Sequence, residues 1–171
     1  VIILVCLCGV WVAGFAYLMR TIKRLPALRD EDAPTPAVWP RLSVIVPACN
    51  EASTLEAALT TLLRQDYPDL ELILVDDRST DGTGAIVERL AGRDPRVRMV
   101  RVETLPAGWL GKVHALQQGV EQSSGAWLLF TDADIHFAPG ALRRSIALVL
   151  HQHIDHFRHA GNEWLSHQAD G

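Results

Sequence analysis

Two pairs of carboxylates in this 171-residue chain each follow a short apolar run. Asp76 and Asp77 come directly after LELILV, and Asp132 and Asp134 begin one residue after AWLLF. Carboxylates that share one place need a positive partner, because like charges repel each other more strongly outside bulk water. A divalent cation that prefers oxygen ligands, Mg²⁺ or Mn²⁺, meets that need. Such an ion could bridge the Asp-x-Asp pair to a diphosphate and neutralise the charge that develops as the diphosphate departs.

A third polar cluster, Asn50 and Glu51, follows the apolar run LSVIV after the segment PAC. Taken alone, each cluster also fits an ordinary turn or helix start, because Asp, Asn and Glu are common there. The repetition after separate apolar runs favours ligand binding instead. In an open parallel sheet the carboxyl ends of the strands border one crevice, where ligands bind. The three clusters are therefore expected to converge on one edge of a sheet.

Short apolar runs alternate along the chain with segments of helical periodicity. Continuous apolar residues predict buried strands, and apolar residues that recur every three or four positions predict helices. This alternation predicts an α/β fold with a mostly parallel, doubly wound sheet. The expected strands are residues 42–46, 70–75, 97–102 and 126–130, and the expected helices begin with a capping box at residues 53–56 and continue at 86–90, 112–122 and 141–150.

Lys112 is the candidate cation of the predicted crevice. It follows a loop that contains Gly108 and Gly111, and it lies at the start of the helix expected over residues 112–122. The amino end of a helix, with a lysine beside it, favours anions because the backbone N–H groups and the helix dipole are positive there. A surface lysine that ends a loop would have the same sequence pattern, so that alternative stays open.

Other side chains are expected to have ordinary structural roles. Val113, Leu116 and Val120 recur at helical spacing and are expected to lie on one face of their helix. His114 is expected on the surface of that helix, and His136 is expected to pack within a strand.

The composition excludes several classes of protein. With 16 Lys and Arg against 20 Asp and Glu, and 6% aromatic residues, the chain lacks the basic surface and stacking rings that bind nucleic acid. Cys6, Cys8 and Cys49 form no C-x-x-C motif, so neither a zinc ribbon nor a disulfide framework is supported. No G-x-G-x-x-G or G-x-x-x-x-G-K-[ST] motif follows the first apolar run, which disfavours a dehydrogenase and a P-loop NTPase.

Residues 1–19 form an uncharged apolar run. A helix of that length, at about 1.5 Å per residue, spans roughly 28 Å, close to the hydrocarbon core of a bilayer. Arg20, Lys23 and Arg24 follow without an A-x-A-like cleavage site, which favours a membrane anchor over a signal peptide and a cytosolic position for the rest of the chain. Residues 20–40, with four prolines, are expected to be a basic flank and an extended linker.

Four motifs in order, LSVIVPACNE, LELILVDDRSTDGT, GWLGKVHALQQG and WLLFTDADIHFAP, resemble the family 2 glycosyltransferases of the GT-A fold. The segment LPAGWLGK and the apolar N-terminus are most similar to the membrane-bound branch, which includes hopanoid-associated and ceramide-glucosyltransferase-like enzymes. The resemblance implies a nucleotide-sugar-binding domain over residues 41–150. It implies metal-dependent transfer of a sugar from a UDP-sugar to a lipid-type acceptor, with inversion, at a bacterial inner membrane with the domain in the cytosol.

The resemblance also implies a role for each candidate residue. Asp77 would accept an N–H group of the base, with Asp76 supporting it, and Lys112 would meet the diphosphate. Asp132 would touch the ribose or the donor sugar and, together with Asp134, would hold the Mg²⁺ or Mn²⁺ ion. The residues after the first strand that would border the nucleotide are Pro47, Ala48 and Glu51.

The C-terminal end departs from the family pattern. The general base and the Q-x-x-R-W-type acceptor motif of the family lie downstream of Asp-x-Asp, and neither occurs before Gly171. Residues 151–171 carry five histidines, for which a zinc site is conceivable but a truncated or frame-disrupted end is favoured. Two other functions stay open: a nucleotidyltransferase, and a membrane-tethered nucleotide-sugar-binding module without activity.

Overall fold

The structure is a computed structural model that describes residues 11, 14–15, 17–20 and 33–151. Most of the predicted anchor at 1–19, the linker up to residue 32 and the tail from residue 152 lie outside the described residues. Within the described ranges, no helix is both long and apolar enough to cross a membrane. The chain divides into two compact units, residues 1–32 and 33–171, and the described residues of the first unit are all helical.

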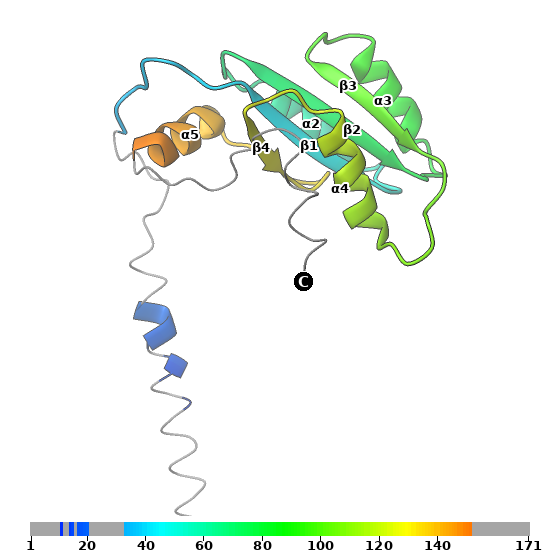
Figure 1. The fold of residues 1–171 in the computed structure, drawn as a ribbon, viewed down its shortest axis with the longest axis horizontal. Coiled ribbons are helices and arrows are strands. Elements are labelled where there is room, and N and C mark those ends of the chain that lie inside the picture. The colour runs from blue at the N-terminus through cyan, green and yellow to red at the C-terminus, as the bar shows by residue number, and fades with distance from the viewer. Residues whose placement is uncertain (1–10, 12–13, 16, 21–32, 152–171) are drawn as a thin grey trace, which may run out of the picture. The chain divides into compact units, whose positions relative to one another are not determined.

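Parallel strands form the sheet of the second unit: β1 (Leu42–Ala48), β2 (Leu70–Asp77), β3 (Val97–Val102) and β4 (Trp127–Phe130). Their spatial order is β3-β2-β1-β4, so β1 is paired on both sides (Figure 1). The chain builds outward from β1 to β3 and then returns to place β4 on the other side of β1. Such a reversal opens a crevice at the carboxyl ends of the two strands that flank it, here β1 and β4. The predicted mostly parallel α/β architecture is confirmed.

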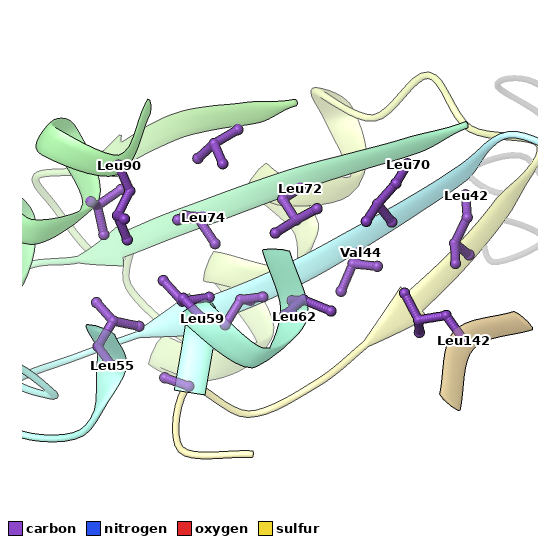
Figure 2. Close-up of a cluster of buried hydrophobic side chains, with 14 of the residues drawn as sticks. Leu42, Val44, Leu55, Leu59, Leu62, Leu70, Leu72, Leu74, Leu90 and Leu142 are labelled. Atoms are coloured by element: carbon purple, nitrogen blue, oxygen red, sulfur yellow. The ribbon is translucent and has the colours of Figure 1, made fainter. Parts of the chain in front are cut away.

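Among the described residues of this unit, four helices cover the sheet: α2 (Leu55–Leu63), α3 (Thr83–Ala91), α4 (Gly111–Glu121) and α5 (Ala141–His151). Successive side chains of a strand point to opposite faces, and a parallel sheet buries both of them. On one face, α2, α3 and α5 pack against a cluster that includes Val44 and Leu72, as Figure 2 shows. On the other face, α4 packs against a cluster that includes Ile45 and Ile73. Each face of the sheet therefore has its own core.

The described part of the predicted linker, residues 33–40, contains neither helix nor strand. Its end is attached to the domain, because the ring of Trp39 meets the ring of Tyr67 edge-on with 5.4 Å between centroids. The Tyr67 hydroxyl also donates a hydrogen bond to the carbonyl oxygen of Pro40 at 2.6 Å. The segment is thus anchored just before β1 begins.

The capping box predicted at residues 53–56 is wrong. Thr54 is the N-cap of α2, but its side chain makes no capping hydrogen bond. Its hydroxyl instead donates to the Glu51 carboxylate at 3.1 Å. The Glu56 carboxylate, which would have completed the box, pairs with both terminal nitrogens of Arg89 on α3 at 2.9 and 3.0 Å. A bidentate charged pair is a stronger hydrogen-bonding arrangement than a single bond to a backbone N–H, so the tertiary partner prevails.

The predicted apolar face of α4 contacts the sheet in part. Leu116 and Val120 are partly buried against the core, whereas Val113 is 50% exposed, and the buried positions are the small residues Ala115 and Gly119. A Cβ atom placed on Gly119 would lie 2.4 Å from Cγ2 of Ile45 and 3.2 Å from Cγ2 of Val75. The helix backbone therefore approaches the sheet more closely than a larger side chain allows. The spacing of apolar side chains gives no sign of this contact, because the helix makes it with its backbone.

We expect Gly119→Ala to lower the free energy of unfolding by about 1–2 kcal/mol, because overpacking against Ile45 outweighs the gain in helix propensity. Val113→Ala, on the exposed side of the same helix, should change it by less than about 0.5 kcal/mol. Urea unfolding measures both variants. A loss at position 113 as large as the loss at position 119 would contradict the observed orientation of α4.

A buried carboxylate joins the sheet to the loop after α4. The side chain of Glu71 is 6% exposed and accepts hydrogen bonds from the hydroxyl of Ser43 at 2.6 Å and from the backbone N–H of Ser124 at 3.0 Å. Arg41 and Arg98 lie 3.7 and 3.6 Å from the same carboxylate. Burial acts to raise the pKa of Glu71, but the hydrogen bonds from Ser43 and Ser124 and the charge of Arg41 outweigh burial and hold the pKa below the ordinary value of 4.5.

We expect Glu71→Gln to lower the free energy of unfolding by about 2 kcal/mol at neutral pH, because it removes buried, charge-assisted hydrogen bonds. Since the folded chain lowers the pKa of this group, its ionisation stabilises the fold fully above about pH 4.5, and the contribution is lost as pH falls through the folded-state pKa. The difference between wild type and variant should therefore shrink in acid. Urea unfolding at several pH values tests this, with the exposed Glu88→Gln as control. A difference that is independent of pH would contradict the assignment.

Candidate functional site

A cleft of about 450 Å³ opens at the carboxyl ends of β1, β2 and β4. Four segments that are distant in sequence meet in it: the end of β1 with its following loop, the end of β2, the first turn of α4, and the loop after β4. Parallel pairing brings these ends together, because all the strands terminate at the same edge of the sheet. Seven of the eight residues predicted from sequence line the cleft: Pro47, Ala48, Glu51, Asp77, Lys112, Asp132 and Asp134.

Asp76 is the predicted site residue that does not line this cleft. Consecutive residues of β2 point to opposite faces, so Asp77 turns toward α4 and Asp76 turns toward α3. Asp76 accepts a hydrogen bond from the backbone N–H of Ser79 at 3.3 Å, and Arg101 lies 3.8 Å from its other oxygen. Asp76 instead lines a neighbouring hollow of about 510 Å³. The alternation of the strand therefore separates the two adjacent carboxylates.

Arg78 is a cleft residue that the sequence analysis missed. Its Nε and Nη2 atoms donate to the two carboxylate oxygens of Asp77 at 2.7 and 3.1 Å. This bond to Asp77 is the main reason that the pKa of the Arg78 guanidinium is raised. A residue directly after Asp77 in a strand would point away from it, but Arg78 has a φ of 58° and turns back. The sequence did not predict this left-handed conformation, because arginine is not a residue type that indicates a positive φ.

Lys112 forms an ion pair with Asp132, and both residues line the cleft. Its Nζ atom lies 2.5 Å from Oδ1 of Asp132. The two side chains are 62% and 56% exposed, so solvent screens their attraction and the pair contributes little to stability. The pairing places a cation from the amino end of α4 beside a carboxylate from the loop after β4. Two candidates that the sequence could not relate to each other are thus direct neighbours.

The carboxylates of the cleft fit a metal ion that is shared with a substrate phosphate. Within the part of the chain that the structure describes, no group of three or more His, Cys, Asp or Glu side chains is placed to hold a metal ion. Mg²⁺ commonly binds one or two protein carboxylates together with waters and substrate phosphates. Asp132 and Asp134 both border the cleft and are exposed, whereas Ala133 between them is 4% exposed. They supply the number and the type of protein ligands that a shared ion takes.

The loop after β1 is fastened to the loop after β2. The side-chain oxygen of Asn50 accepts from the backbone N–H of Thr80 at 2.8 Å, and the backbone N–H of Glu51 donates to the hydroxyl of Thr83 at 2.9 Å. That hydroxyl donates in turn to Asp81 at 2.6 Å. The hydrogen bond from Thr83 is the largest cause of the lowered pKa of Asp81, followed by the backbone N–H of Ala52. The segment STDGT therefore helps to position Glu51 at the cleft.

One histidine differs from its predicted environment. His136 is exposed and lies outside the strands, in the loop after β4. His114 lies on α4 and is partly exposed as a residue, but its Nδ1 atom is buried without a hydrogen-bond partner among the described residues, and its ring meets the ring of Trp109 edge-on at 5.4 Å. Three further cleft residues were not singled out as site residues: Cys49, Gly111 and Ala133.

Comparison with known proteins agrees with this geometry. The model of the family described as "Glycosyl transferase family 2" matches residues 43–162. A GalNAc(5)-diNAcBac-PP-undecaprenol beta-1,3-glucosyltransferase of Campylobacter jejuni is 37% identical over 103 residues, which is 60% of this chain and 32% of that protein. A PGL/p-HBAD biosynthesis glycosyltransferase of Mycobacterium bovis is 37% identical over 95 residues, 56% of this chain and 36% of that protein. The chain spans well under half the length of these curated relatives.

Solved structures share the fold as well. The mannosyltransferase PcManGT from Pyrobaculum calidifontis, in complex with GDP-Man and Mn²⁺, matches with a TM-score of 0.65 and 33% identity over 81% of this chain and 40% of that chain. S. aureus TarS 1-349 in complex with UDP-GlcNAc matches with a TM-score of 0.57 and 30% identity over 66% of this chain and 32% of that chain.

We expect Thr83→Val to loosen the cleft loop, because valine keeps the volume of this fully buried residue but removes the hydroxyl that bonds Glu51 and Asp81. Leaving a backbone N–H without its partner costs about 1–3 kcal/mol in unfolding free energy. Amide hydrogen exchange at Glu51 should accelerate. The matched variant Thr80→Val removes a longer, exposed hydroxyl contact of 3.3 Å and should have little effect. Equal protection of Glu51 in wild type and Thr83→Val would contradict the proposed fastening.

Proposed function

The chain belongs to glycosyl transferase family 2, and we propose that its cleft binds a nucleoside-diphosphate sugar, a UDP-sugar by preference, for transfer to an acceptor hydroxyl. One observation carries the proposal: a buried carboxylate, a lysine and an Asp-x-Asp pair from separate segments share one cleft at the switch point of a parallel sheet. Two similar structures hold nucleotide sugars, GDP-Man in one and UDP-GlcNAc in the other, which supports the same class of donor here.

Each group has a task that suits its position. Asp77, at the carboxyl end of β2, accepts an N–H group of the base, and Pro47, Ala48 and Glu51 border the nucleotide. Lys112 leaves its partner Asp132 to bind the diphosphate. The free-energy cost of separating this pair is small, because the pair is exposed and weak. Asp76, which faces α3, supports the end of β2 from the other side of the sheet.

Asp132 and Asp134 would hold Mg²⁺ or Mn²⁺ together with the diphosphate oxygens. The Mn²⁺ in the similar mannosyltransferase structure supports this choice of ion. When bound, the ion supplies positive charge that stabilises the diphosphate as it departs.

The proposed reaction is a direct displacement. The acceptor oxygen forms a bond to the anomeric carbon from the side opposite the diphosphate. The bond between that carbon and the phosphate oxygen breaks, and its electron pair stays on the diphosphate. The configuration of the sugar is therefore inverted. The acceptor proton passes to a carboxylate base, a role that we assign to none of the described residues.

We propose a lipid-type acceptor and a position at a membrane, with the cleft on the cytosolic side of a bacterial inner membrane. The undecaprenol in the name of the Campylobacter relative supports a lipid-linked acceptor. The apolar run over residues 1–19 and the basic residues that follow it support the anchor and its orientation.

Calorimetric titration of the chain with UDP-glucose in the presence of Mn²⁺ tests donor binding. We expect Asp134→Ala to weaken binding at least tenfold, about 1.4 kcal/mol, because one of two carboxylate ligands is lost. Asp69→Ala is the matched control, since Asp69 is as exposed as Asp132 (55% against 56%) but precedes β2, at the opposite edge of the sheet. Binding that is absent in wild type, or unchanged by Asp134→Ala, would overturn the donor or the metal assignment.

A transfer assay with a lipid extract then tests the reaction. Transfer of sugar with release of UDP is the expected result. Release of pyrophosphate would indicate a nucleotidyltransferase instead, and binding without transfer would indicate a nucleotide-sugar-binding module.

A further inference from the structure

The Asp77 carboxylate is buried and already engaged on both oxygens. Its side chain is 5% exposed, and the two nitrogens of the Arg78 fork occupy one lone pair on each oxygen. An ionised carboxylate offers about four acceptor positions, so positions remain for a ligand in the cleft that both residues line. The fork therefore fixes the direction of the carboxylate without using up its capacity to accept.

The backbone of Arg78 adopts a conformation that residues other than glycine rarely adopt. Its φ of 58° lies in the left-handed region, which costs an L-residue roughly 1–2 kcal/mol. The backbone N–H of Arg78 donates to the carbonyl oxygen of Val102 at 3.1 Å, which ties this turn to the end of β3. The turn is what reverses the side chain onto Asp77. Strained positions of this kind are concentrated at functional sites.

The first residue of α4 is a glycine, which leaves room for the Arg78 side chain beside Asp77. A Cβ atom on Gly111, the first residue of α4, would lie 2.7 Å from Nη2 of Arg78 and 3.0 Å from Oδ2 of Asp77. The amino end of α4 thus lies directly against the pair and confines it. Arg78 also borders both the cleft and the hollow beside Asp76.

We propose that Arg78 is a positioning residue that sets the nucleobase selectivity of the cleft by holding Asp77 as a fixed acceptor. The inference rests on the proposed function, because it concerns the base of the donor nucleotide. A fixed carboxylate favours bases that present a ring N–H, uracil and guanine. It disfavours cytosine and adenine, whose corresponding ring nitrogen carries a lone pair that faces the carboxylate oxygens. A base without this N–H leaves the buried carboxylate without a hydrogen-bond partner, and the free-energy cost of that loss selects against the base.

Titration with UDP, GDP, CDP and ADP at one fixed Mg²⁺ concentration measures this selectivity. We expect wild type to bind UDP or GDP at least tenfold more tightly than CDP and ADP. Arg78→Met should weaken binding of the preferred nucleotide at least tenfold and binding of CDP and ADP less, so the differences in affinity become smaller. Arg78→Lys keeps the charge but not the two-pronged hydrogen bonding, and its affinities should fall between those of wild type and Arg78→Met. Arg101→Met is the matched control, because Arg101 lies beside Asp76, lines the neighbouring hollow and should leave the ranking unchanged.

A double-mutant cycle with Asp77→Asn separates positioning from direct contact. If Arg78 acts through Asp77, Arg78→Met should weaken UDP binding by less than threefold in the Asp77→Asn background. Additive losses of binding free energy in the double mutant would overturn the inference. Unchanged differences between the nucleotide affinities in Arg78→Lys would overturn it as well. If circular dichroism shows that Arg78→Met does not fold, the Arg78→Lys result decides the question. Wild type that binds none of the four nucleotides would overturn the proposed function itself, whereas binding without base preference would overturn this inference alone.

Discussion

Parallel pairing on both sides of β1 is the constraint on which the rest of this structure depends. Because β2 and β4 run in the same direction as β1, all three strands end at one edge, and the residues that follow them must meet there. The alternation of side chains then selects which of them face the same way. Asp77 turns to the cleft and Asp76 turns to α3, although the two are adjacent in sequence. Geometry of the sheet, more than the identity of any single residue, defines the site.

Two ion pairs in the cleft differ in burial, and the difference assigns them different tasks. The carboxylate that pairs with Arg78 is 5% exposed and confined by the amino end of α4, so that pair is costly to separate. The pair of Lys112 with Asp132 is more than half exposed and is easily exchanged for other charges. A buried, fixed acceptor and an exposed, exchangeable pair suit the proposed donor, which has a neutral base at one end and a charged diphosphate in its middle.

The positions of the strands and of the polar residues that follow them were predictable from the sequence for physical reasons. A strand buried on both faces is a largely apolar run, so β1 and β2 begin where their runs begin, and the two carboxylates that end β2 are conspicuous. The periodicity of apolar residues could not predict which of several possible contacts a side chain makes in the folded protein. Glu56 took a charged partner on α3 in place of a capping bond, and α4 approaches the sheet most closely at Gly119, a residue that the apolar spacing does not mark. The capping error came from treating a helix as if its own sequence decided its contacts.

The sequence by itself therefore determined the class of fold, the family and most of the residues that line the cleft, because apolar runs and the motifs that end them are local properties of the chain. Tertiary structure alone decided which charges neutralise which. Arg78 folds back on Asp77 through a left-handed turn tied to the end of β3, and Lys112 meets Asp132 across 20 residues of chain. Such pairings depend on where separate segments come to lie, and that information exists only once the sheet has brought their ends together.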